Sequence, residues 1–136
     1  MRMKSGDCGI CTFASIADIS YEDSLEFFRK SVWEKDKDRK IPLVWKNEME
    51  SALTKFNLTF YKRNSVKYIG LIGGTNPVIL HPRAPGFFRH WIIYLPDQKY
   101  VIDPDPGQPD QVFDLIRYKV PRKYFEVDLQ PAENLL

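Results

Sequence analysis

Residues 6–19, GDCGICTFASIADI, place both cysteines of the chain three positions apart, where a helix is predicted to begin. Four apolar residues recur at helical spacing in this stretch: Ile10, Phe13, Ala14 and Ala17. The spacing predicts a helix from Gly9 or Ile10 to about Asp18. Its amino-terminal turn carries the two thiols, so the chemistry of this turn guides the interpretation of the remaining sequence.

Two further amphipathic helices are predicted in the first half of the chain. Residues 20–32, SYEDSLEFFRKSV, open with Ser20 and Asp23 three positions apart, which resembles a capping box, and continue with apolar residues on one face. In residues 42–58, apolar residues are spaced by four, four and three positions: Trp45, Met49, Leu53 and Phe56. This spacing is typical of a helix that buries one face.

Downstream, the periodicity changes from helix to strand. Strands are predicted over residues 58–63, 76–81, 90–95, 99–103 and 123–129, and a short helix over residues 111–118. Two of these strands flank the turn Pro96-Asp97-Gln98 and form a predicted hairpin. We therefore expect an α+β fold, a single domain over residues 1–136, in which N-terminal helices pack on a C-terminal antiparallel sheet.

Size and charge narrow the function classes. A chain of 136 residues is about one domain long and has enough apolar side chains for one core. Its formal net charge of +2 is too small to predict a nucleic-acid or membrane partner. No apolar run approaches the roughly 18 residues of a membrane span, and MRMKSGDCG has no apolar signal core. We expect a cytoplasmic protein, or one exported as an effector by a route that the sequence does not reveal.

The two cysteines, Cys8 and Cys11, can be compared with several kinds of cysteine site: a zinc site, a redox pair and a disulfide. A zinc site needs four ligands, usually from paired Cys or His groups, whereas this chain has one Cys pair and two distant histidines. A thioredoxin-like pair follows a strand, and only seven residues precede Cys8. A disulfide between positions three apart requires unusual geometry. We therefore expect two reduced thiols, no metal and no cofactor.

Cys8 is the stronger candidate for a nucleophile. A thiolate in the first turn of a helix is stabilised by unpaired amides and by the positive end of the helix dipole. Such a nucleophile needs an imidazole, which needs an orienting acceptor in turn. His90 opens the first strand of the predicted hairpin and Asp103 closes the second, so the ladder can bring them together.

Each residue also has a purely structural interpretation. For a cysteine considered by itself, the commoner case is a small buried hydrophobe, and this explains both Cys8 and Cys11. His90 fits a strand edge, and Asp103 before a proline is a common end of a strand. Trp91, beside the histidine, is a candidate for a wall of a substrate groove or for the core. The joint pattern nevertheless favours a triad of Cys8, His90 and Asp103.

Several stretches resemble one known family. DCGICTFASIADISYEDSLEFFRK resembles the opening of the papain-like cysteine peptidase domains that cut double-glycine leader peptides in bacteriocin exporters. NPVILH, HWIIYL and YVIDPDPG resemble their later strands, and PDQVFDLIRY resembles the short helix that follows. The resemblance runs from Asp7 to about Tyr118. It implies a papain-like fold with Cys8 as nucleophile, His90 as general base or imidazolium partner, and Asp103 as the group that orients His90.

The chain departs from this family at the oxyanion hole. Family members carry a glutamine several residues before the cysteine, but MRMKSGD contains none, and Arg2 or Lys4 occupies that region. The hole would then depend on the backbone amide of Cys8, and losing one donor commonly costs about 2.7–4 kcal/mol of transition-state stabilisation. The transporter part of the exporters has no counterpart here, so leader processing is not implied.

A second resemblance favours the other thiol. CGICTF is similar to the Asp-Gly-x-Cys-x-Phe signature of ovarian-tumour-type deubiquitinases, with Gly9 and Phe13 in place and Cys11 as the catalytic residue. Those enzymes usually have their histidine close to the end of the domain, whereas His90 lies well before the end of this chain.

The leading functional hypothesis is a cysteine peptidase-like hydrolase. It would cleave a peptide or isopeptide bond of a peptide or protein substrate through a Cys-His-Asp triad. Three alternatives stay open: a glutamine deamidase or transglutaminase-type enzyme, a deubiquitinase-like thiol enzyme, and a catalytically inactive papain-like module that binds a peptide or protein.

Overall fold

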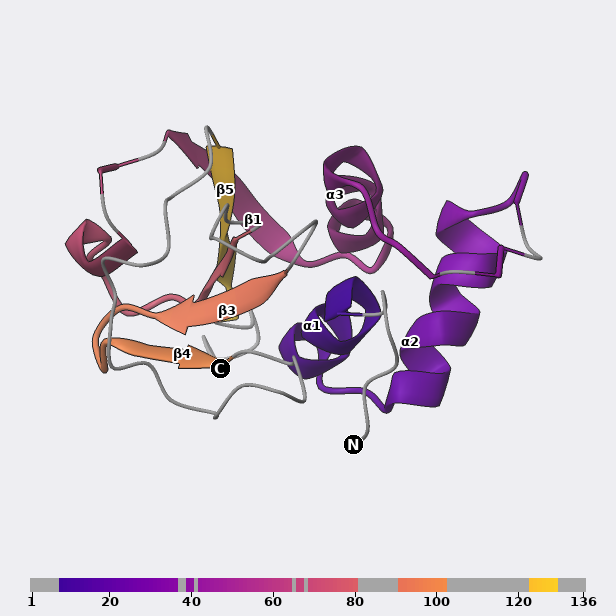
Figure 1. Cartoon of the computed structure of the whole chain (residues 1–136), viewed down its shortest axis with the longest axis horizontal. Helices are drawn as coiled ribbons and strands as arrows, with labels where there is room; N and C mark the ends of the chain where they lie inside the picture. The colour runs from indigo at the N-terminus through magenta and orange to yellow at the C-terminus, as the bar shows by residue number, and fades with distance from the viewer. Residues whose placement is uncertain are drawn as a thin grey trace, which may run out of the picture.

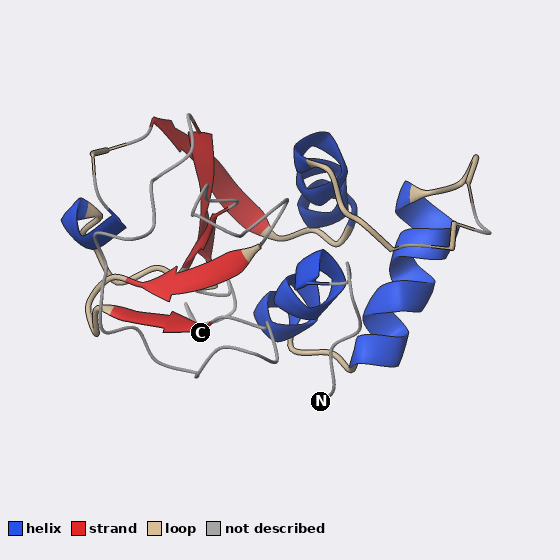
Figure 2. Cartoon of the chain, in the orientation of Figure 1, coloured by secondary structure: helices blue, strands red, loops and turns tan. Residues whose placement is uncertain are grey.

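The computed structural model describes residues 8–36, 39–40, 42–64, 66–67, 69–80, 91–102 and 123–129. The helices are α1 (Cys8–Ala17), α2 (Tyr21–Phe27) and α3 (Lys46–Lys55), with a π-helical turn η1 (Phe28–Val32) and a 3-10 turn η2 (Ile69–Leu71). The strands are β1 (Thr59–Asn64), β2 (Val78–Leu80), β3 (Ile92–Leu95), β4 (Tyr100–Ile102) and β5 (Lys123–Asp128). Helices and one antiparallel sheet confirm the α+β prediction (Figure 2).

Helix α1 lies at the centre of the molecule, between β3 and α2 (Figure 1). Eight of its ten residues are buried, so it is apolar on nearly every side, as a helix with neighbours on both sides must be. It ends at Ala17, and Asp18 takes a left-handed conformation with φ 58°. The predicted bounds of this helix are therefore confirmed to within two residues.

Helix α2 begins as its sequence predicts. The Ser20 side chain accepts a hydrogen bond of 3.0 Å from the backbone N–H of Asp23. Within the helix, the buried hydroxyl of Ser24 donates to the Ile10 carbonyl at 2.9 Å, which fastens α2 to α1. After Phe27 the backbone continues as the π-helical turn η1.

Helix α3 differs from its prediction at the first apolar position. Met49 and Leu53 are fully buried, but Trp45 is 41% exposed. Trp45 precedes the helix with an extended backbone (φ −84°, ψ 162°), so its side chain does not follow the helical phase. Its backbone N–H donates to Glu48 Oε1 at 2.9 Å. The expectation that Trp45 belongs to the buried face is wrong.

The five strands form one sheet in the order β1-β5-β2-β3-β4, and every pair is antiparallel. The predicted hairpin is β3 and β4, joined by a turn in which Lys99 has φ 50°. Strand β1 forms one edge, and five of its six residues are exposed. Its partner β5 comes from the end of the described chain, so the sheet joins segments that are far apart in sequence.

Both faces of the sheet carry buried apolar side chains. On one face, Ile79, Ile93 and Phe125 pack with the helices. Phe13 of α1 lies in this cluster, with its ring centroid 5.3–5.4 Å from those of three other phenylalanines: Phe27, Phe28 and Phe56. This helix-side cluster contains the amino-terminal end of α1.

The opposite face is packed against η2. Ile69 and Ile72 pack there with alternate residues of the central strands, among them Ile92 and Tyr94. Tyr94 is fully buried, and this burial raises the pKa of its hydroxyl because the phenolate is poorly solvated. Across the residues whose placement is given, no helix combines the length and the apolar character needed to span a bilayer.

Candidate active site

Cys8 occupies the first position of α1. Its side chain is 5% exposed and belongs to the helix-side cluster. The first four amides of a helix have no partner within the helix, and the dipole places positive charge at the same end. The nucleophile predicted from sequence therefore lies in a nearly dry environment, at the end of α1 that favours a negative charge.

The backbone N–H of Trp91 donates a hydrogen bond to Cys8 Sγ, with an N-to-S distance of 3.3 Å. The two residues are 83 positions apart in the chain. Trp91 immediately precedes β3 and follows His90 in the sequence. The structure thus brings the start of β3 to the thiol in the first turn of α1.

A third segment, the one that precedes α3, also contacts Trp91. The indole N–H of Trp91 donates to the carbonyl oxygen of Val44 at 2.9 Å, and both side chains are buried. Trp91 is only 1% exposed, so its side chain is part of the core and does not line an open groove. Cys8, Val44 and Trp91 therefore come from three distant segments and meet at one place.

Gly9 permits this close approach. A Cβ atom at Gly9 would lie 2.6 Å from Cβ and 2.7 Å from Cγ2 of Val44, and 3.0 Å from Cδ1 of Trp91. Real Cβ atoms essentially never come that close to other heavy atoms. Glycine after Cys8 is thus required by packing: it lets Val44, in the segment before α3, and Trp91, the residue before β3, contact the backbone of α1.

Cys11 provides a contrast on the same helix. Like Cys8, it is 5% exposed, and neither cysteine forms a disulfide. In the described ranges, no group of three or more His, Cys, Asp or Glu side chains is arranged to hold a metal ion. The two thiols differ in position along α1 and in the hydrogen bond from Trp91, but not in exposure.

The two predicted partners of Cys8, His90 and Asp103, lie outside the described residues. So do Arg2, Lys4 and the helix predicted over residues 111–118. Their neighbours are described: Trp91 follows His90, and Ile102, the last residue of β4, precedes Asp103. In the β3–β4 ladder, Ile102 pairs with Ile93.

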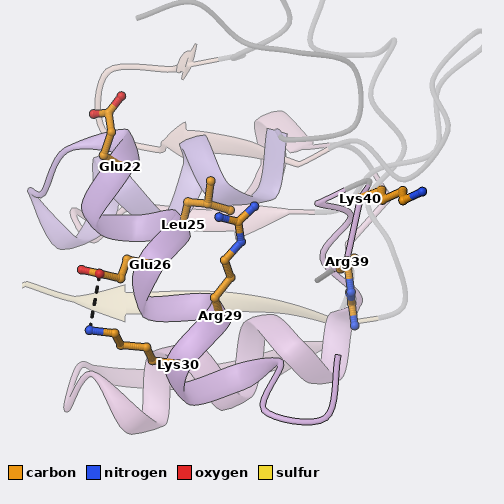
Figure 3. Close-up of a pocket in the computed structure, with 7 residues that line it drawn as sticks. All are labelled: Glu22, Leu25, Glu26, Arg29, Lys30, Arg39 and Lys40. Atoms are coloured by element: carbon orange, nitrogen blue, oxygen red, sulfur yellow. Dashed lines mark ion pairs between the residues drawn. The ribbon is translucent and has the colours of Figure 1, made fainter. Parts of the chain in front are cut away.

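A hollow of about 850 Å³ lies elsewhere on the surface, over α2, η1 and the segment that follows them (Figure 3). Seven residues line it: Glu22, Leu25, Glu26, Arg29, Lys30, Arg39 and Lys40. Charges of both signs are present, and Lys30 pairs with Glu26 at 3.4 Å. None of the predicted catalytic residues is among them.

Arg39 in this lining is held by its own neighbours. Its guanidinium binds both carboxylate oxygens of Glu48, at 3.0 and 2.9 Å, and also donates to Asp36 and to the Leu43 carbonyl. The hydrogen bond with Glu48 is the main reason that its pKa is raised. Arg39 is thus committed to holding the segment before α3, so we assign the hollow no catalytic role.

The comparison of the chain with models of known protein families finds no match, and neither does the comparison with curated proteins. The chemistry of the candidate site therefore has to be inferred from its own residues. Sequence reasoning placed Cys8 and the strand after His90, but it missed Val44 and the reason for Gly9. The only signal for them was a glycine directly after a cysteine at a helix start.

Proposed function

We propose that the chain is a cysteine-dependent acyl-transfer enzyme, most simply a peptidase, with Cys8 as its nucleophile. The hydrogen bond from the Trp91 amide to Cys8 Sγ carries this proposal, because it ties the thiol to the residue that follows His90. His90 directly precedes Trp91 in the sequence, so the proposal assigns the imidazole partner of the thiol to position 90.

The β3–β4 ladder supports Asp103 as the third member. Ile102 pairs with Ile93, two residues after Trp91, so the chain leaves β4 near the point where it enters β3. Directly opposite residues of an antiparallel pair have Cα atoms about 4.5–5.5 Å apart. Asp103 directly follows Ile102, so we assign its carboxylate the role of accepting a hydrogen bond from His90 and orienting it.

In the proposed reaction, the Cys8 thiolate attacks the carbonyl carbon of a peptide or isopeptide bond, and a C–S bond forms. The C–N bond breaks as His90 gives its proton to the leaving amine. Water then attacks the thioester, His90 accepts a proton from it, and the carboxylic acid leaves as the thiolate is restored. Attack on a glutamine side-chain amide by the same steps would make the enzyme a deamidase.

The papain-like fold and the relation to double-glycine leader peptidases belong to this proposal. Their support is a central helix whose first turn carries Cys8 and contacts the start of a strand in an antiparallel sheet. In such a nearly dry site, the amide of Cys8 would stabilise a developing oxyanion more strongly than in water.

The burial of Cys8 favours one second candidate, a papain-like module that binds a peptide or protein without cleaving it. At 5% exposure within an apolar cluster, Cys8 has the surroundings of a small core residue. In this module the sulfur would fill space, and the Trp91 hydrogen bond would serve only folding.

Site-resolved alkylation separates these two functions. The folded protein is treated with iodoacetamide at neutral pH, and the labelling rates of Cys8 and Cys11 are followed by mass spectrometry. Equal exposure of the two thiols makes Cys11 an internal control. A peptidase predicts that Cys8 reacts on the order of tenfold faster or more, and that His90→Ala removes the difference.

Equal, slow labelling of both thiols would instead identify the binding module, and faster labelling of Cys11 would favour the deubiquitinase-like alternative. A peptide library digested by the wild type, with Cys8→Ser as the inactive control, then identifies the reaction. New peptide ends indicate a peptidase, and conversion of glutamine to glutamate indicates a deamidase.

A further inference from the structure

Trp91 contacts the candidate site through two of its own N–H groups. Its backbone N–H donates to Cys8 Sγ at 3.3 Å, and its indole N–H donates to the Val44 carbonyl at 2.9 Å. At 1% exposure, the ring is fully enclosed. The indole bond therefore limits how the backbone of Trp91 can move relative to the thiol.

The Val44 end of this contact is held independently. Arg39 donates to the carbonyl of Leu43 at 2.8 Å and binds both carboxylate oxygens of Glu48. Glu48 also accepts the backbone N–H of Trp45 at 2.9 Å. The residues on both sides of Val44 are thus anchored, so its carbonyl is a fixed acceptor for the indole.

The contact with α1 leaves little free space. Gly9 has room for no Cβ atom because Val44 and Trp91 already press against the backbone of the helix. In close-packed interiors a small displacement of one side chain is transmitted to its neighbours. The indole, Val44 and the first turn of α1 therefore hold one another in place.

From these contacts we propose that Trp91 is a positioning residue for the Cys8 thiol: the indole bond to Val44 aims the Trp91 backbone N–H at Sγ. The inference rests on the proposed function, since only a reactive thiol gains from being oriented. Hydrogen bonds to a charged acceptor are roughly twice as strong as those to a neutral one, so a donor aimed at sulfur favours the thiolate.

The test uses Trp91→Phe, which keeps an aromatic ring and removes the indole N–H. Trp33→Phe is its matched control: Trp33 is 2% exposed, and its indole N–H has no hydrogen-bond partner in the described part of the chain. Both variants and the wild type are alkylated as above, over a range of pH, and the ratio of the Cys8 rate to the Cys11 rate is measured.

We expect Trp91→Phe to lower this ratio about threefold to tenfold, the factor equivalent to one hydrogen bond, across the pH range. Trp33→Phe should leave the ratio unchanged. An unchanged ratio in Trp91→Phe overturns the inference, and so does an equal fall in both variants, because general loosening would then be the cause.

If iodoacetamide labels Cys8 of the wild type no faster than Cys11, the proposed function itself is refuted. This result does not depend on any Trp91 variant. If Trp91→Phe fails to fold by circular dichroism, benzothienylalanine replaces Trp91. This residue keeps nearly the shape of tryptophan and has sulfur in place of the N–H group. A fall in the ratio supports the inference, and a wild-type ratio overturns it.

Discussion

Two contacts between distant parts of this chain are made in opposite ways. At the first turn of α1, Cys8 and Trp91 meet through buried atoms, 5% and 1% exposed, and through a hydrogen bond from a neutral backbone amide. At the outer edge of the sheet, Arg63 of β1 meets Glu126 of β5 through a charged pair at 2.8 Å, with side chains 47% and 25% exposed.

The two regions differ in the interactions that determine their geometry. Around Cys8, shape and directed hydrogen bonds determine the geometry, because little of the surface of Cys8 and Trp91 is exposed to water. Along β1 and β5, charge determines the contact, and water and salt are close enough to weaken it. Substitutions near Cys8 should therefore cost the most stability, whereas substitutions at the sheet edge should change how stability depends on pH and salt.

The largest effect is expected for Gly9→Ala. Alanine is normally the better helix residue by about 1 kcal/mol, but here its Cβ would meet Val44 and Trp91 at 2.6–3.0 Å. We expect the substitution to lower the free energy of unfolding by about 1–3 kcal/mol, measured by urea denaturation.

Gly73→Ala is the control for this prediction, because nothing lies within 4 Å of a Cβ at Gly73. It should be neutral or stabilise the protein by up to about 1 kcal/mol. Val44→Gly removes both Val44 side-chain atoms that would meet a Cβ at Gly9, so the double variant should lose less stability than the sum of the two single variants. A stabilised Gly9→Ala would show that α1 is not as close to Val44 as the structure has it.

An intermediate effect is expected for Glu126→Gln. The side-chain amide of Asn76 donates to Glu126 Oε2 at 2.8 Å, and this bond, followed by that from Arg63, lowers the pKa of Glu126 below its ordinary 4.5. A carboxylate with a lowered folded pKa stabilises the protein above its unfolded pKa, and the contribution is lost as pH falls through the folded pKa.

Wild type should therefore be more stable than Glu126→Gln at pH 7, by about 1 kcal/mol, with the difference shrinking once the pH falls below about 4.5. Urea midpoints of both proteins from pH 7 to pH 3 measure it. A difference that stays constant over this range would mean that Glu126 gains nothing from its charge.

The smallest effect is expected for Glu50→Gln. Glu50 of α3 pairs with Lys62 of β1 at 3.2 Å, and these side chains are 39% and 53% exposed. The substitution should cost less than about 0.5 kcal/mol at low salt and nothing at high salt. A larger loss that persists in high salt would show that this edge is held as rigidly as the first turn of α1.

Local sequence signals predicted much of the architecture. The helix that starts at the cysteines, the Ser20 cap and the β3–β4 hairpin depend on residues within a few positions of one another, and each is confirmed. The same reasoning assigned Trp45 to a buried face. It failed there because helical spacing says nothing about the residue that precedes a helix with an extended backbone.

Of the candidate site, the sequence predicted Cys8 and the start of the strand after His90, while the roles of His90 and Asp103 stay predictions. Val44 was out of reach. It contributes a backbone carbonyl that accepts from Trp91 and side-chain atoms that fit against Gly9, and no local sequence pattern marks either contribution.

The amino-acid sequence alone thus determined the element types, the antiparallel hairpin and a thiol at a helix start, because backbone preferences and apolar periodicity are set by near neighbours. The tertiary structure alone decided that Trp91 donates to Cys8 across 83 positions and to Val44 across 47. Such contacts arise only when separate surfaces pack to full density, which fixes distances that no local pattern encodes.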